Sequence, residues 1–302
     1  MVQKDSRKSS SLVFLFSASA LLLSLLQIGK WASKSAVITS LTGSTSQNVS
    51  TIITGHFSCD HNYTIEIMSF DPLVIYVNNF VTEQEIDHLL GVTKDTWEDS
   101  YVSHRRDDQY FSELDKEWRS SQSAIIETKD PVSECLKRRL TNILGNLQHI
   151  DTEPLQLVKY EGGEPFRMHQ DWLHIPKNVT FNAQHRHRLH NRLITSFTYL
   201  EDDCTGGETY FPELVGVGSK ADGDKFSRTE TGKGLLVKPK RGNAVLWNNL
   251  FMNGTGDERL SHASLPVKSG RKIGMNLFSV YYLDTPIVGD GVADDSIHQQ
   301  VQ

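Results

Sequence analysis

A histidine and an aspartate two residues apart carry the strongest chemical signal in this sequence. His169 and Asp171 close the segment Tyr160–Asp171, and alternate residues of a strand project from the same face. Both side chains can therefore reach one metal ion. His262, much further along the chain, offers a third ligand. Two histidines and one carboxylate form the facial triad of non-haem Fe(II) oxygenases, so the sequence predicts an iron site with three open positions.

Lys272, shortly after His262, offers a cation for a dianionic co-substrate. A buried anion without a partner is costly, so such a ligand needs a cation of this kind. Lys272 and Gly274 share strand parity, which predicts that Lys272 points inward beside Gly274, whose missing side chain leaves room for a ligand. Arg271 has the opposite parity and is expected to face solvent.

Each of these residues also has a structural interpretation. His169 and Asp171 could form a hydrogen-bonded pair without a metal, and Lys272 could be a surface lysine. The presence of His262 and Lys272 in register behind the first pair favours the metal site and its anion pocket.

A longer array of residues carries a family resemblance between Phe70 and Leu283. Its members occur in this order: Tyr160 with Gly162 and Gly163, His169, Asp171, Arg192–Thr195 running into Tyr199–Leu200, Gly206–Pro212, His262 and Lys272. In this array the chain resembles the prolyl 4-hydroxylase family of 2-oxoglutarate- and Fe(II)-dependent dioxygenases, in its catalytic alpha-subunit-like domain.

The resemblance implies a co-substrate and roles for named residues. His169, Asp171 and His262 would hold Fe(II), and Lys272 would bind the far carboxylate of 2-oxoglutarate. Tyr199 would donate its hydroxyl to the same carboxylate, and Tyr160 would line the pocket near the keto acid. Tyrosines in strands are often core residues, and that alternative stays open for both. Dioxygen would be the second co-substrate, L-ascorbate the reductant, and succinate and CO2 the co-products.

The resemblance further implies 4-hydroxylation of prolyl residues in secretory-pathway polypeptides. Phe166, Leu265 and Ile273 replace a tyrosine, a cysteine and a tryptophan of related enzymes, which leaves the substrate open. The same oxygenase chemistry on another side chain or on a small metabolite is one alternative. A catalytically silent barrel that acts as a binding module is another, and the complete triad disfavours it.

Composition narrows the class of protein. The chain has 302 residues, 38% of them hydrophobic, which is enough for an ordinary packed core. Its formal net charge is −6, so it has no basic surplus for binding the phosphates of a nucleic acid. We therefore expect no nucleic-acid partner.

The amino-terminal region has the pattern of a membrane anchor. Basic residues in a cytoplasmic tail, residues 1–10, precede an uncharged apolar run at 11–29, which as a helix is just long enough to cross a bilayer. This predicts a signal anchor, a flexible stalk at 30–64, a dioxygenase domain at 65–285 and a polar tail at 286–302. The expected location is the endoplasmic reticulum membrane, as a single-pass type II protein with a lumenal catalytic domain. Secretion after signal cleavage is the alternative.

Two further features agree with a secretory compartment. Sequons for N-glycosylation occur at Asn48, Asn62, Asn178 and Asn253. The three cysteines, Cys59, Cys135 and Cys204, allow one disulfide without fixing which two residues form it.

The elements expected to position these residues are helices followed by many short strands. A strand is predicted at Leu73–Val77, a helix after the capping-box spacing Thr82–Glu85, and a longer helix from Asp130 to Leu147. Further strands are predicted at Leu155–Tyr160, Leu193–Leu200, Gly234–Val237, Asn243–Trp247 and Ile273–Leu283. This order indicates an α+β protein with a double-stranded β-helix, or jelly-roll, core and supporting N-terminal helices. The polar segment Glu213–Lys233 is expected to form a loop near the barrel mouth.

Overall fold

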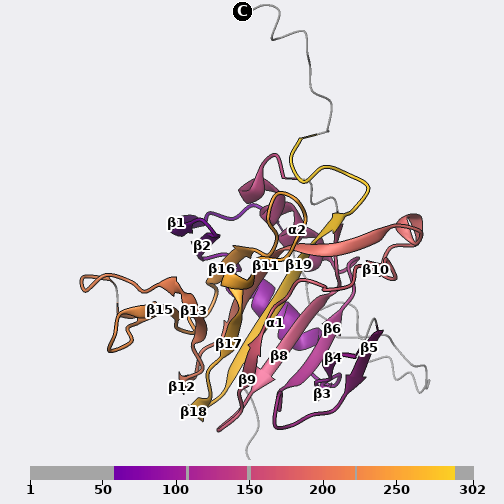
Figure 1. Cartoon of the computed structure of the whole chain (residues 1–302). Coiled ribbons are helices and arrows are strands. Elements are labelled where there is room, and N and C mark those ends of the chain that lie inside the picture. The colour runs from indigo at the N-terminus through magenta and orange to yellow at the C-terminus, as the bar shows by residue number, and fades with distance from the viewer. Residues whose placement is uncertain (1–57, 107–108, 148–150, 222, 290–302) are drawn as a thin grey trace, which may run out of the picture. The chain divides into compact units, whose positions relative to one another are not determined.

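The computed structural model describes most of the predicted dioxygenase domain (Figure 1). The residues described are 58–289, apart from 107–108, 148–150 and 222. The predicted cytoplasmic tail and signal anchor, most of the stalk and residues 290–302 lie outside them. Within the described part, no helix is long and apolar enough to cross a membrane.

Two α-helices form where the sequence predicts them. Helix α1, Glu83–Val92, begins with a complete capping box, in which the Thr82 hydroxyl accepts from the Glu85 N–H and the Glu85 carboxylate accepts from the Thr82 N–H. Helix α2, Pro131–Leu144, begins at Asp130, whose carboxylate accepts from the N–H groups of Val132 and Ser133. It ends earlier than predicted because Gly145 follows with a φ of 60°.

A ten-stranded antiparallel sheet forms the centre of the fold. Its main path runs β1 (Thr64–Phe70), β2 (Leu73–Asn78), β16 (Ala244–Asn248), β11 (Leu189–Glu201), β19 (Lys272–Tyr282), β8 (Leu155–Tyr160), β6 (Gln122–Ile126) and β3 (Glu98–Asp99). Off this path, β10 (Lys177–Asn178) pairs with β11, and β7 (Asp151–Thr152) pairs with β19. All five predicted strands that follow α2 are present. Four of them belong to this sheet, and the one predicted at Gly234–Val237 belongs to a second sheet.

The second sheet has five strands. They run in the order β14 (Phe226–Ser227), β15 (Lys233–Val237), β13 (Thr209–Val215), β17 (His262–Ser264) and β9 (Phe166–His169). Two separate antiparallel pairs complete the strands, β4 (Val102–Arg106) with β5 (Gln109–Glu113), and β12 (Cys204–Gly206) with β18 (Val267–Gly270). Short 3-10 turns occur at Ala183–His185 and Glu258–Leu260.

Alternating side chains of the large sheet separate two apolar cores. In β16, Leu246 belongs to the core shared with α1 and α2, whereas Val245 and Trp247 belong to the core shared with the five-stranded sheet. In β19, Met275 likewise packs with the helices. The helices, the large sheet and the small sheet are thus three layers (Figure 1), and the mostly β architecture fits a jelly-roll oxygenase fold.

Two features differ from the sequence prediction or refine it. The segment Glu213–Lys233 is not a loop throughout, because β13 extends to Val215 and Phe226 is buried in the core between the sheets. Cys59 and Cys135 form a disulfide across 76 residues of sequence, which leaves Cys204 as a free thiol.

Candidate active site

Pairing of two short strands brings the first histidine of the predicted triad to the second. In the register of β9 and β17, His169 lies directly opposite His262. The sequence predicted that Asp171 lies within the same strand as His169. In the structure Asp171 lies just beyond the end of β9. The chain therefore turns out of the sheet immediately after His169 and carries Asp171 to the same place.

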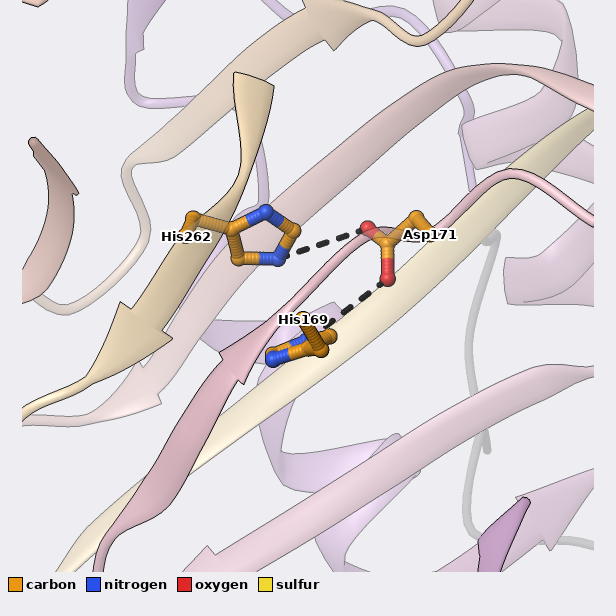
Figure 2. Close-up of side chains that lie close together, drawn as sticks. All are labelled: His169, Asp171 and His262. Carbon is orange, nitrogen blue, oxygen red and sulfur yellow. Dashed lines mark ion pairs between the residues drawn. The ribbon is translucent and has the colours of Figure 1, made fainter. Parts of the chain in front are cut away.

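The three predicted ligand side chains converge (Figure 2). Asp171 Oδ1 lies 3.8 Å from His169 Nε2, and Asp171 Oδ2 lies 3.6 Å from His262 Nε2. One ligand atom from each residue lies within 4.8 Å of the others. The two nitrogen-to-oxygen distances exceed those of a hydrogen bond, so the interpretation of a simple hydrogen-bonded pair does not fit.

Backbone carbonyls fix the tautomer of both imidazoles. His169 Nδ1 lies 2.8 Å from the carbonyl oxygen of Arg167, and His262 Nδ1 lies 2.9 Å from that of Leu260. A carbonyl only accepts, so each Nδ1 carries the proton and each Nε2 keeps its lone pair toward Asp171. A hydrogen bond from the second ring nitrogen to a carbonyl is usual for metal-bound histidine, and the donor set of two nitrogens and one carboxylate fits Fe(II).

The charge state of the cluster suits a cation. Burial and the neighbouring His262 lower the pKa of His169 to about 3, so its imidazole stays neutral at physiological pH. Burial alone would raise the pKa of Asp171, but His262, His169 and Arg192 hold it below its ordinary value. The site therefore offers the neutral imidazole of His169 beside one negative carboxylate.

A buried polar chain holds the Asp171 carboxylate in place. The Thr195 hydroxyl donates to Asp171 Oδ2 at 2.8 Å, and the Asn249 amide donates to the Thr195 hydroxyl at the same distance. On the other side, Arg192 donates to the backbone oxygen of Asp171 at 3.3 Å and is held by both carboxylate oxygens of Glu153, at 2.8 and 2.7 Å. These partners restrict Asp171 to one orientation.

Aromatic contacts fix the planes of the histidines. The ring of Phe166 stacks on His169 with a centroid separation of 3.7 Å, and the Arg119 guanidinium covers Phe166 at 4.5 Å. Trp247 meets His262 edge-on at 4.7 Å. The phenylalanine at position 166 thus supports a ligand without offering a hydroxyl to the pocket.

Lys272 is completely buried, as its inward parity predicts. Its ammonium group donates to the carbonyl oxygen of Gly207 at 2.8 Å and to the Ser264 hydroxyl at 2.5 Å. Burial lowers the pKa of Lys272 to about 7. Lys272 has no carboxylate partner among the described residues and no contact with solvent. It can therefore act as the counter-ion of an anion that binds beside it. Arg271 faces outward and pairs with Glu201, also as predicted.

The two predicted tyrosines lie near Lys272 in different ways. The ring of Tyr160 lies 4.5 Å from the Lys272 nitrogen and lines the cavity. The Tyr199 hydroxyl is fully buried and bonds to Thr209 at 2.8 Å, and it is Thr209 that lines the cavity. Gly274 does not leave room for a ligand, because the ring of Phe197 occupies the space where its side chain would lie.

A cavity of about 400 Å³ connects these groups. Tyr160, Phe197, Thr209 and Ser264 line it beside Lys272, and the three predicted ligands line it further out. Beyond them it is lined by Tyr101, Val102, His104, Tyr110, Trp118, Met168, Trp172, His174 and Lys177. The space thus runs from residues that contact the buried Lys272, past the His–Asp–His cluster, to an aromatic rim.

Similarity to known proteins identifies the chemistry. The profile of the 2OG-Fe(II) oxygenase superfamily matches residues 155–280. Three relatives come from Arabidopsis thaliana: probable prolyl 4-hydroxylase 6 (28% identity, 68% of this chain and 68% of that protein), prolyl 4-hydroxylase 1 (28%, 70% and 70%) and prolyl 4-hydroxylase 2 (29%, 69% and 67%). The chain is a prolyl 4-hydroxylase-like 2-oxoglutarate/Fe(II) oxygenase.

The sequence did not single out several residues that support the site of this oxygenase. Thr195 belongs to the recognised array, and its parity with Tyr199 along β11 is the signal that places it inside. Asn249 and Glu153 carried no such signal, because a buried amide and a buried carboxylate look like ordinary polar residues in a sequence. Ser264 lies two residues after His262 in β17, so strand parity would also have found it.

Removing the Thr195 hydroxyl should weaken metal binding. In Thr195→Val the Asp171 carboxylate loses its buried donor, and Asn249 loses its acceptor, so we expect the affinity for Fe(II) or Mn(II) to fall about tenfold or more. Calorimetric titration of the metal into the apoprotein measures this directly.

Thr198→Val is the matched control. Thr198 lies on the same strand, is equally buried, and its hydroxyl has no hydrogen-bond partner among the described residues. Thr195→Ser should restore the affinity. Equal losses in the two valine variants would show that Thr195 acts only in folding.

Proposed function

We propose that this oxygenase hydroxylates prolyl residues of polypeptides at C4, with Fe(II) held by His169, Asp171 and His262 and with 2-oxoglutarate as co-substrate. The observation that carries this proposal is the His–Asp–His cluster on a cavity whose lining residues Tyr160 and Ser264 contact a fully buried lysine, Lys272. The relatives named as prolyl 4-hydroxylases support the choice of substrate.

When bound, Fe(II) and 2-oxoglutarate supply the activation of dioxygen, with conversion of the keto acid to succinate and CO2 and hydroxylation of a C–H bond. Asp171, held by Thr195 and Arg192, keeps one negative ligand in a fixed orientation. Lys272 binds the far carboxylate of the co-substrate, with Thr209 and Ser264 as neighbouring hydroxyl donors. The aromatic rim receives the polypeptide and limits access of water to the reacting atoms.

The alternatives differ in what the protein binds at its rim. Hydroxylation of another side chain or of a small metabolite would use the same inner site. A silent binding module would have no need for two imidazoles with fixed tautomers around a buried carboxylate, so this geometry favours an active enzyme.

Succinate formation tests the proposal. We expect the protein, supplied with Fe(II), 2-oxoglutarate and L-ascorbate, to form succinate faster when proline-rich peptides are added, with a mass gain of one oxygen on the peptide. His262→Ala should lose at least 100-fold in rate, because it removes one of three metal ligands. His187→Ala changes an exposed histidine outside the cavity and should keep full activity. Slow succinate formation that no peptide accelerates would rule out prolyl substrates.

Lys272 should make co-substrate binding dependent on pH. Its pKa in the ligand-free protein is lowered to about 7 by burial, and a bound dianion favours the charged form. Below pH 7 the lysine is already protonated; above it, binding must take up a proton, and affinity should fall up to about tenfold per pH unit.

Calorimetry in buffers of different ionisation enthalpy counts that proton. With Mn(II) in the site, we expect close to one proton taken up per 2-oxoglutarate at pH 8 and close to none at pH 6. Lys272→Met should bind weakly with no proton uptake at either pH. Proton uptake that does not change with pH in the unmodified protein would contradict the role of Lys272.

We also propose that the enzyme works in the endoplasmic reticulum, with its catalytic domain in the lumen. The Cys59–Cys135 disulfide suits an oxidising compartment. The sequon residues Asn62, Asn178 and Asn253 are all exposed, as glycosylation requires.

Glycosidase treatment tests the compartment. We expect the protein from secretory-competent cells to migrate faster after removal of N-glycans, and Asn62→Gln, Asn178→Gln and Asn253→Gln to show which sites are used. Unchanged mobility together with free thiols at Cys59 and Cys135 would contradict a lumenal location.

A further inference from the structure

The residues that line the cavity carry more positive than negative charge, although the chain as a whole has a formal net charge of −6. Among the described residues that line it, the permanent cations are Arg119, Lys177 and Arg192, and the only carboxylate is Asp171. In the proposed complex, Asp171 is a metal ligand, and the charges of Fe(II), Asp171, 2-oxoglutarate and protonated Lys272 cancel. The inner site therefore has no anion left for the cations of the rim.

Two of these cations have no carboxylate partner in the described part of the chain. Arg192 is neutralised by Glu153 through two hydrogen bonds of 2.8 and 2.7 Å. Arg119 and Lys177 form no ion pair with any described residue. Charge complementarity at a binding surface steers association and selects partners, so these two groups bear on which substrate enters.

Arg119 is the more deeply placed of the two. It is 8% exposed, and its guanidinium donates to neutral oxygens, the hydroxyls of Ser121 and Ser123 and the carbonyl of Tyr101. Burial lowers the pKa of Arg119, because the protein around the guanidinium stabilises its charge less than water does. A buried cation of this kind is stabilised when an anion binds within reach.

Lys177 lies at the rim itself. It is exposed, and its ammonium group lies 4.2 Å from the ring centroid of Tyr110, whose hydroxyl accepts from the N–H of Ile175 at 3.1 Å. The cation–π contact holds the positive charge over the cavity wall, and the Tyr110 hydrogen bond ties that wall to the chain next to Lys177. A substrate that enters past Tyr110 must pass this charge.

We infer that the outer cavity selects a polypeptide segment in which aspartate or glutamate residues lie close to the target residue. The inference rests on the proposed function, and it names the class of polypeptide which that function would act on. The exposed aromatic and apolar groups of the rim, such as Tyr101 and Met168, favour an extended segment over a free small anion, because they offer surface for side chains on either side of the target.

Three fluorescent peptides test this selection. All share one central proline tract and differ only in flanks of glutamate, glutamine or lysine. Anisotropy titrations with the whole protein measure binding without turnover. We expect the glutamate peptide to bind most tightly and the lysine peptide most weakly, with differences of about three- to tenfold that shrink as salt is raised.

A charge reversal at Lys177 supplies the decisive comparison. In Lys177→Glu, the glutamate peptide should bind about five- to tenfold more weakly and the lysine peptide more tightly than in the unmodified protein. Lys159→Glu is the matched control: Lys159 also makes a cation–π contact, at 4.8 Å from Trp97, forms no ion pair with a described residue and does not line the cavity. Its peptide affinities and its succinate formation should stay unchanged.

The outcomes separate this inference from the proposed function. Equal affinities for the three peptides, or equal effects of the two lysine reversals, would overturn the inference. If the glutamate peptide binds through Lys177 but no peptide is hydroxylated, the charge selection stands and prolyl hydroxylation fails. If all three peptides are hydroxylated with the same KM, prolyl hydroxylation stands and the charge selection fails.

Discussion

The negative charge of Asp171 is the constraint on which the rest of the site depends. A carboxylate that is 8% exposed is stable only if neighbouring groups replace the water it has lost. Thr195 and Arg192 supply hydrogen bonds to its side chain and backbone, while the two histidines present lone pairs rather than protons. These hydrogen bonds compensate the buried charge of Asp171 only in part. The charge that remains can attract a metal cation, which suits a metal site.

The large sheet allows one strand to serve stability and chemistry at the same time. Along β19, Asn276 and Phe278 line the cavity and Lys272 bonds to the lining residue Ser264, whereas Met275 and its alternate neighbours pack under the helices. In β11 a register shift between Arg192 and Ile194 changes the parity, so that Arg192 lines the same cavity as Phe197. A regular strand would have turned Arg192 away from Asp171.

The convergence of His169, Asp171 and His262 was predictable from sequence because these residue types are rare in this combination. His169, Asp171, His262 and Lys272 identify each other by type and order, and the capping box at Thr82 and the Asp130–Pro131 pair set the helix starts. The bounds of the very short strands β9 and β17 were not predicted, since three or four residues give no readable alternation. The partner of a side chain in a distant strand is equally invisible, which is why Asn249 behind Thr195 and Phe197 beside Gly274 were missed.

The Cys59–Cys135 disulfide also has a mechanical consequence. It closes a loop that contains β1, β2, α1, β3, the β4–β5 pair and β6, across a sequence separation of 76 residues. When the chain is pulled from its two ends, this loop cannot lengthen while the bond is intact, so its elements are shielded from the stretching force. Load passes instead from Cys59 into α2 and on to β8 and the strands that follow. The catalytic half of the fold is therefore the part that a stretching force would extend first.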